Sequence, residues 1–460
     1  MKRTVSDELA SDPRVVEAKR VLLDSLAEYQ KRISGIRPPV PELRVSYDVL
    51  VKEFGELRGG PLFFPYLGSG LGNGVLVELA DGSVKYDFIS GIGVHYWGHS
   101  HRAVVEAQLN AAMRDIVMQG NLQQNVEGVS LARTLLSGAN RKGAKLRHCF
   151  ISTSGAMANE NALKAIFQKK YPADRILAFD GCFMGRTLAL SQITDKAAYR
   201  EGLPPSMSVD YVPFFDPGRP EESTRTAVDS LKRFLGRYPG KHAVMCLELV
   251  LGEGGFHPGQ RTFFLALVEV LQQHNVAILV DEIQTFSRTT ELFAYQHFGL
   301  DDHVDVVTIG KSAQVCATLF KEEYKPRAGL LSQTFTASTS ALFAADVIIR
   351  ALMDGDYFGP DGKIARIHSY FETRLEEIQS RLPGLIAGPF GIGAMIAFTP
   401  FGGDPEKVKK FIHALFDAGV ISFYAGSDLS RVRFLLPIGA VTFADIDAVC
   451  SILEDTLRSS

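Results

Sequence analysis

Short apolar runs alternate with longer stretches of helical periodicity between about residues 100 and 330. The runs cover residues 146–151, 175–179, 209–212, 243–249, 277–280 and 304–309. This alternation is typical of a mostly parallel sheet whose strands are connected by crossover helices. It predicts an α/β fold with a large domain, residues 96–345, built around one central sheet.

A different pattern follows this region. Helical periodicity over residues 342–352 and 364–382 leads to an apolar run at 395–398 and then to two more helices. Helices grouped around few strands indicate an α+β arrangement. We therefore predict a smaller C-terminal domain over residues 346–460.

The chain before the large domain falls into two parts. Residues 14–55 have charged helical periodicity broken by three prolines, which predicts a helix, a loop and a second short helix in an N-terminal arm, residues 1–60. Residues 61–95 contain a glycine-rich stretch, two apolar runs and the turn pair Asp81-Gly82 between them. This order predicts a β-hairpin, which we expect to join the small domain.

Composition limits the class of protein. Hydrophobic residues make up 46% and charged residues 22% of the 460 positions, the balance of an ordinary globular protein. The formal net charge of -3 gives no reason to expect nucleic acid or an anionic membrane as a partner, so a small-molecule ligand is the better expectation. No apolar stretch has the length of a signal peptide or a membrane span, which predicts a cytoplasmic protein. Five scattered cysteines favour free thiols over a disulfide framework.

Two strand ends carry side chains suited to catalysis. Asp281 directly follows the apolar run 277–280, and Lys311 follows the run 304–309 through Gly310. Ligands of open α/β sheets bind at the carboxyl ends of the strands, and a partly desolvated lysine there is suited to Schiff-base chemistry. Taken alone, each has a simpler interpretation, because an aspartate in this place is often a helix cap and a lysine a surface charge.

Three further motifs bear on the kind of ligand that the protein binds. Residues 153–161, rich in small and hydroxyl side chains, lie between a strand and a helix, where backbone amides can bind an anion; the simpler alternative is a helix cap. The glycines at 68–74 lack the spacing of a dinucleotide-binding loop and precede a hairpin. His99 and His101 have no third ligand nearby, so no metal site is expected.

The motifs occur in an order that resembles the class III aminotransferases, which use pyridoxal 5'-phosphate and have fold type I. The resemblance covers about residues 61–457 and is strongest over 281–294 and 305–311. This family includes ornithine, acetylornithine, 4-aminobutyrate and lysine 6-aminotransferases. The resemblance implies a mostly parallel central sheet in a large cofactor-binding domain and a smaller α+β C-terminal domain.

The resemblance also implies roles in cofactor binding. Lys311 would carry the cofactor as a Schiff base and then shuttle a proton, while Asp281 would pair with the pyridinium nitrogen. Gln284 would bind the ring 3-oxygen. The backbone amides of Gly155 and Ala156 would hold the phosphate. The cofactor ring would stack on Phe183; the simpler interpretation of Phe183 is a phenylalanine of the hydrophobic core.

Substrate residues follow from the same resemblance. Arg186 and Arg433 match arginines that bind the distal carboxylate and the α-carboxylate of the substrates, and Glu253 matches an acidic gate that masks Arg433 when an ω-amine is bound. The alternative for Arg433 is a structural salt bridge. Thr334 matches a residue that reaches the phosphate of the neighbouring subunit, which implies a homodimer with shared active sites.

Several positions depart from the family pattern. Met157 stands where the family usually has Glu, and Met184 where it usually has His or Trp. The loop between Thr285 and Arg288 is shorter than in the family. Glycines that the family has are missing from residues 312–316 and 336–339. These changes put the substrate in question more than the cofactor. The segments after Lys311 and at 423–426 resemble the lysine 6-aminotransferases.

The function expected from the sequence is a ping-pong transfer of an amino group from a terminal amine of a lysine- or ornithine-like donor to 2-oxoglutarate. Two alternatives stay open. One is an enzyme with the same cofactor and another outcome, such as an aminomutase, decarboxylase or racemase. The other is a non-catalytic relative that binds a small molecule, prompted by the altered loops near Lys311 and Thr334.

Overall fold

A seven-stranded sheet forms the centre of the protein. The computed structural model describes residues 3–116, 118–426 and 429–460. Along the chain, the strands of this sheet are β5 (Leu146–Ser152), β6 (Arg175–Phe179), β7 (Ser208–Val212), β8 (His242–Leu247), β11 (Ala277–Glu282), β12 (Val306–Ile309) and β13 (Cys316–Lys321). Their order across the sheet is β5-β13-β12-β11-β8-β6-β7. The predicted α/β fold with a mostly parallel sheet is confirmed.

One strand of the sheet was not predicted. β13 pairs antiparallel with both β12 and β5, while β12, β11, β8, β6 and β7 pair in parallel. It follows β12 after only a short turn, and such a connection can return the chain only in the antiparallel direction. The parallel strands β8, β11 and β12 are buried along their whole length, which explains their continuous apolar sequences.

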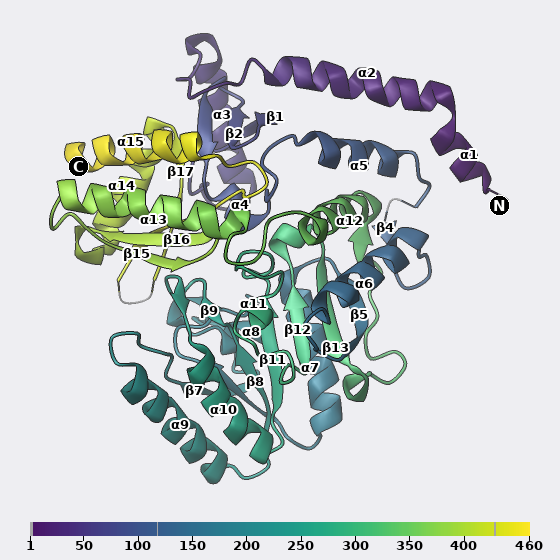
Figure 1. The fold of residues 1–460 in the computed structure, drawn as a ribbon, viewed down its shortest axis with the longest axis vertical. Helices are drawn as coiled ribbons and strands as arrows, with labels where there is room; N and C mark the ends of the chain where they lie inside the picture. The colour runs from purple at the N-terminus through teal and green to yellow at the C-terminus, as the bar shows by residue number, and fades with distance from the viewer. Residues whose placement is uncertain (1–2, 117, 427–428) are drawn as a thin grey trace.

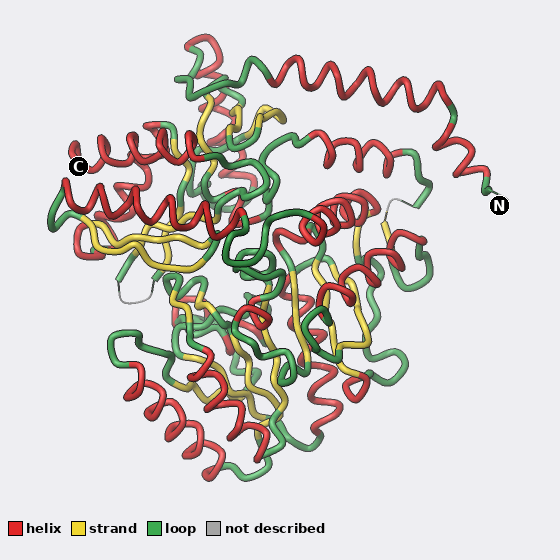
Figure 2. Tube along the Cα trace, viewed as in Figure 1, coloured by secondary structure: helices red, strands yellow, loops and turns green. Residues whose placement is uncertain are grey.

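Helices connect and cover these strands (Figures 1 and 2). α6 and α7 pack against β5, and α7 also contacts β12 and β13. α9 contacts β7 and α10 contacts β11, on the part of the sheet that Figure 1 shows in teal. The helices are α5 (Arg102–Ala112), α6 (Val126–Ala139), α7 (Gly155–Lys170), α9 (Pro220–Arg237), α10 (Arg261–Gln273), α12 (Thr339–Asp354) and the single turns α4 (Ser90–Gly93), α8 (Leu190–Ile193) and α11 (Ala294–His297).

A second, antiparallel sheet lies in the C-terminal part of the chain. It has the order β15 (Ile386–Ile392), β16 (Met395–Pro400), β19 (Arg431–Leu435) and β18 (Phe423–Ala425). The helices α13 (Lys363–Arg381), α14 (Pro405–Ala418) and α15 (Phe443–Ser459) belong to the same part. Apolar residues from this region form a hydrophobic core together with Val75, Leu76 and Phe88 of the hairpin segment.

The predicted hairpin forms and pairs with the C-terminal region. β1 (Gly68–Asn73), β2 (Leu76–Leu79) and β3 (Val84–Asp87) are antiparallel, and the short strand β17 (Val420–Ile421) adds to β3 in parallel. The hairpin segment therefore shares a sheet with residues more than 300 positions away. The division of the chain into four domains stays a prediction.

The N-terminal arm consists of α1 (Val5–Ser11), α2 (Pro13–Gln30) and α3 (Pro41–Leu57). α2 lies along α5, where Lys19 donates a hydrogen bond to Asn110 (Figure 1). α3 is longer than the short helix predicted, because Pro41 occupies its first turn, where a proline costs no hydrogen bond. Within the described residues, none of the helices has the length and apolar character needed to cross a bilayer.

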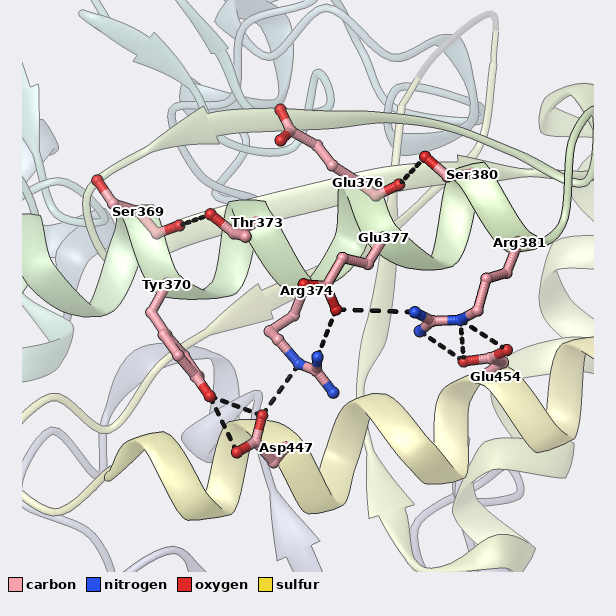
Figure 3. A network of polar contacts seen from close by, with 10 residues as sticks. All are labelled: Ser369, Tyr370, Thr373, Arg374, Glu376, Glu377, Ser380, Arg381, Asp447 and Glu454. Atoms are coloured by element: carbon pink, nitrogen blue, oxygen red, sulfur yellow. Dashed lines mark hydrogen bonds and ion pairs between the residues drawn. The ribbon is translucent and has the colours of Figure 1, made fainter.

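A charged network joins α13 to α15 on the outer side of the C-terminal part (Figure 3). Arg374 contacts Asp447 at 3.0 Å, and Arg381 contacts Glu454 at 2.8 Å. Tyr370 also donates to Asp447. These side chains are partly or well exposed, so each pair contributes at most about 1 kcal/mol. Buried apolar residues of both helices, among them Phe371 and Leu453, belong to the same hydrophobic core.

Candidate active site

A cavity of about 370 Å³ lies at the carboxyl ends of β8, β11 and β12. A neighbouring cavity of about 280 Å³ shares four lining residues with it. The first is lined by eight predicted residues, namely Gly155, Ala156, Phe183, Arg186, Glu253, Asp281, Gln284 and Lys311. Arg433 lines the second. The fold thus brings together side chains from residue 155 to residue 433.

Lys311 stands at the end of β12 in an unusual backbone conformation. Its φ is +50°, in the left-handed region that side chains other than glycine seldom adopt. Gln314, three residues later, has a φ of +61°, and its side-chain amide donates to the carbonyl of Val94 at 2.8 Å. The chain therefore turns here without the glycines of the family pattern, and the turn directs Lys311 into the cavity.

The amine of Lys311 is desolvated. Burial lowers the pKa of Lys311, and the carboxylates of Asp281 and Glu253 partly oppose this effect. A lysine with a lowered pKa has a larger neutral fraction, and the neutral amine is the nucleophile of Schiff-base chemistry.

Asp281 ends β11 inside the protein. Its Oδ2 accepts a hydrogen bond from Asn159 Nδ2 at 2.8 Å, and its Oδ1 accepts from the backbone N–H of Ile283 at 2.9 Å. Burial raises the pKa of Asp281, while these two hydrogen bonds and Lys311 lower it. The carboxylate keeps acceptor capacity for a cationic partner in the cavity.

The start of α7 forms one wall of the cavity. Ser154 caps this helix by accepting from the N–H of Met157 at 3.2 Å. Among the residues that the structure describes, the N–H groups of Gly155 and Ala156 have no protein acceptor. A Cβ on Gly155 would lie 2.8 Å from Ile283, so glycine allows the helix to approach β11 this closely.

Gln284 lies in the segment after β11 and lines the same cavity. Its Oε1 is buried and has no hydrogen-bond partner among the described residues. A Cβ on Gly252 would lie 2.2 Å from this oxygen, so only a glycine at 252 leaves room for the side chain. A buried acceptor without a partner indicates that a donor from a bound molecule belongs here.

Arg433 and Glu253 form an ion pair between β19 and the loop after β9 (Val250–Leu251). Arg433 Nη2 lies 2.6 Å from Glu253 Oε1. Arg433 is fully buried between the rings of Phe256 and Phe423, with its guanidinium carbon 5.7 and 5.6 Å from their centroids. Glu253 keeps 27% of its side chain exposed, so the acid is the partner that can move.

Two predicted residues lie toward the outside. Arg186 is exposed at the rim, where it donates to the hydroxyl of Tyr199 at 3.0 Å and lies 4.1 Å above that ring. Thr334 is exposed and does not line either cavity of its own chain.

Comparison with known protein families identifies the chain. The family model described as aminotransferase class III matches residues 69–457. The chain belongs to the class III aminotransferases. As a member of this family it is a pyridoxal-phosphate-dependent enzyme, and the resemblance noted in the sequence is confirmed.

Relatives of known name agree with this assignment. The acetylornithine aminotransferase of Bacillus subtilis is 30% identical over 395 residues, which cover 84% of this chain and 93% of the relative. That of Methanocaldococcus jannaschii is 29% identical over 408 residues, 84% and 92% of the two chains. The succinylornithine transaminase of Salmonella paratyphi B is 29% identical over 367 residues, covering 76% and 83%.

Solved structures show the same fold. The lysine aminotransferase of M. tuberculosis has a TM-score of 0.78 at 22% identity, covering 89% of this chain and 99% of that one. The ornithine aminotransferase of Toxoplasma gondii has a TM-score of 0.73 at 21% identity, covering 86% and 91%. At these identities the likeness concerns the fold alone, and it confirms fold type I.

The residues in the cavity of this aminotransferase fit pyridoxal phosphate. The N–H groups of Gly155 and Ala156, which have no acceptor among the described residues, suit a phosphate, and the unpartnered Oε1 of Gln284 suits a hydroxyl donor such as the 3-hydroxyl of the ring. The buried Asp281 suits a protonated ring nitrogen, and the desolvated Lys311 suits a carbonyl carbon. Each chemical group of the cofactor therefore has a matching side chain or amide in one cavity.

Glu248 was not among the predicted residues. It follows β8, lines the cavity and accepts from the N–H groups of Phe183 at 2.8 Å and Gly252 at 3.3 Å. Burial, and secondarily the charge of Asp281, raises the pKa of Glu248 to about 8. The signal that identified Asp281 was a carboxylate at the end of a buried apolar run, and Glu248, near the end of the run 243–249, carries a similar signal that could have identified it.

Proposed function

We propose that this enzyme transfers the terminal amino group of a lysine- or ornithine-like donor to 2-oxoglutarate by a ping-pong mechanism. The observation that carries the proposal is the ion pair of Arg433 and Glu253 beside Lys311. A buried arginine paired with a partly exposed carboxylate provides a binding site for an α-carboxylate that can be opened or closed.

The proposed cofactor contacts use the residues of the first cavity. When bound, pyridoxal phosphate supplies an electrophilic carbon and an electron sink for the carbanion formed at the substrate. Lys311 holds the cofactor covalently through Nζ, and Asp281 keeps the ring nitrogen protonated. Gly155 and Ala156 bind the phosphate through their N–H groups, Gln284 binds the ring oxygen, and Phe183 lies against the ring.

The proton transfer is assigned to Lys311. As a free and desolvated amine beside the substrate, Lys311 Nζ would remove the proton from the substrate carbon that bears the amino group and would later give it back. Its lowered pKa supports this role, because it raises the neutral fraction of the amine, which is the form that can accept the proton.

Substrate selection is assigned to three charged residues. With an ω-amine donor, Glu253 remains paired with Arg433, and the distal carboxylate of the donor binds Arg186 at the rim. With glutamate or 2-oxoglutarate, Glu253 moves away and Arg433 binds the α-carboxylate, while Arg186 binds the distal one. The names of the relatives, acetylornithine aminotransferase and succinylornithine transaminase, support an ornithine-like donor.

We also propose a homodimer with shared active sites. Thr334 and Phe335 are exposed and line neither cavity of their own chain, as expected of residues that reach a neighbouring subunit. Light scattering and a Thr334→Ala variant with weakened cofactor retention test this assignment.

The decisive experiment for the reaction is a donor screen with 2-oxoglutarate. Purified enzyme is incubated with ω-amines and α-amino acids, with and without the keto acid, and both glutamate and the products formed from each donor are measured. We expect turnover that requires 2-oxoglutarate, and parallel lines in double-reciprocal plots. Product formation without any keto acid would instead identify an aminomutase, decarboxylase or racemase.

A further inference from the structure

We propose that Asn159 is a positioning residue for Asp281, and that Thr308 fixes the orientation of the Asn159 amide. The inference rests on the proposed function, because Asp281 matters only as the partner of the cofactor ring. Asn159 lies in the second turn of α7 and is fully buried, yet it does not line the cavity.

The amide of Asn159 contacts two strands of the large sheet and one loop. Its Nδ2 donates to Asp281 Oδ2 and to the carbonyl of Met184, both at 2.8 Å. Its Oδ1 accepts from Thr308 Oγ1 at 2.7 Å. Asp281 and Thr308 are direct neighbours across the parallel strands β11 and β12. One side chain therefore ties a helix, two strands and a cavity loop together.

The hydrogen-bond pattern allows only one orientation of this amide. The Asp281 carboxylate and the Met184 carbonyl are acceptors, so the nitrogen of Asn159 must face them with both of its hydrogens. The hydroxyl of Thr308 then has to donate to the remaining oxygen. If Thr308 lost its hydroxyl, the amide oxygen would be buried without a donor, and the side chain would lose the contact that fixes it.

This arrangement acts on the carboxylate in two ways. The hydrogen bond to Oδ2, together with that from Ile283 to Oδ1, holds both oxygens of Asp281 in a fixed plane. Both bonds also favour the charged form, which counteracts the burial that disfavours it. A carboxylate that is oriented and charged before the cofactor binds needs no reorganisation afterwards.

The alternative is that Asn159 only supports the fold by satisfying Met184. The chain offers a matched control that separates the two interpretations. Thr318 on β13 is the direct neighbour of Thr308, is equally buried, and also donates to α7, at the carbonyl of Ala158 at 2.7 Å. Thr308 and Thr318 thus differ mainly in whether their partner touches Asp281.

The test compares Asn159→Ala, Thr308→Val and Thr318→Val with the wild-type enzyme. We measure the dissociation constant of pyridoxal phosphate by dialysis, the pH dependence of its visible absorbance when bound, steady-state rates, and the melting of the cofactor-free protein. Loss of one charge-assisted hydrogen bond corresponds to about a tenfold effect, so we expect Asn159→Ala to weaken cofactor binding and lower kcat by about tenfold or more.

Thr308→Val should weaken cofactor binding and lower kcat by a smaller factor than Asn159→Ala, and it should shift the pH titration of the cofactor absorbance. Thr318→Val should retain wild-type cofactor binding and spectra. The inference is overturned if Thr308→Val and Thr318→Val behave alike, or if Asn159→Ala changes only the melting temperature. Thr308→Val keeps the question answerable should Asn159→Ala fail to fold. Failure of the proposed function is recognised separately, because the wild-type enzyme would then not turn over or would not bind the cofactor.

Discussion

The pair of Arg433 and Glu253 leads to the most specific prediction about substrate choice. Replacing Arg433 with Gln removes the proposed contact to the α-carboxylate of glutamate. Hydrogen bonds between charged groups are worth about 1.5 to 3 kcal/mol, so kcat/KM for the glutamate half-reaction should fall by about 10- to 150-fold. The ω-amine half-reaction should fall much less, because Arg433 is masked by Glu253 during that step.

The reverse change, Glu253→Gln, should act in the opposite direction. The ion pair joins a fully buried arginine to an acid with 27% of its side chain exposed. Exposed pairs contribute up to about 1 kcal/mol, and breaking a buried pair costs about 3 to 5 kcal/mol, so we assign about 1 to 2 kcal/mol here. Glutamate no longer has to displace the acid, and its half-reaction should become about 5- to 30-fold more efficient, at the expense of the ω-amine.

Half-reaction kinetics provide the assay. Each substrate is mixed with the enzyme alone, and the spectral change from the pyridoxal to the pyridoxamine form of the bound cofactor, or the reverse, is followed by stopped flow. Arg431→Gln is the matched control, because Arg431 lies on the same strand but donates to the carbonyl of Gly255 and stacks on Phe390 outside both cavities. Equal losses for both substrates in Arg433→Gln and Glu253→Gln would refute the gate and leave a structural salt bridge.

Three further predictions concern single residues. Asp281→Asn should keep the fold, measured by circular dichroism, and lower kcat by about 100- to 1000-fold, because the ring nitrogen loses the charge that stabilises its proton. Near-normal turnover would show that the ring nitrogen of the cofactor does not pair with Asp281. The pKa of Glu248, about 8, exceeds that of an unfolded glutamate, so the folded cofactor-free protein retains a proton that the unfolded chain loses, and stability falls as pH rises from about 4.5 toward 8. Glu248→Gln should reduce this fall in melting experiments at pH 5 and 8.5, and identical pH profiles would contradict the assignment. Thr442→Ala removes the capping box that Thr442 and Asp445 form at the start of α15, and should cost about 1 kcal/mol in urea unfolding without changing kcat; an unchanged midpoint would mean that the cap is dispensable.

The parallel strands β8, β11 and β12 were predictable because they are buried along their whole length and therefore have continuous apolar sequences. β13 (Cys316–Lys321) was not predicted because its apolar residues are interrupted by Thr318, and because its pairing with β5 and β12 is seen only in three dimensions. The glycine-rich strand β1 lacks the side chains that ordinarily indicate a strand, and it is held by pairing with β2.

The site residues that could be predicted from the sequence lie at a strand end or in a motif of the family. Asp281 and Lys311 follow buried runs, and the rule that ligands bind at the carboxyl ends of strands places them together. Asn159 could not be found in this way, because its partner Asp281 is 122 residues away and nothing local distinguishes it from a helix surface residue. The left-handed backbone of Lys311 and Gln314 also had no signal, because neither position is a glycine.

Covalent trapping of the cofactor tests the central assignment most directly. The holoenzyme is reduced with borohydride, digested and mapped by mass spectrometry, with Lys311→Ala treated in parallel. We predict one modified peptide, carrying the reduced cofactor on Lys311, and no modification in the variant. A cofactor attached to another lysine, or a wild-type protein that carries none, would contradict the assignment of this cavity as the active site.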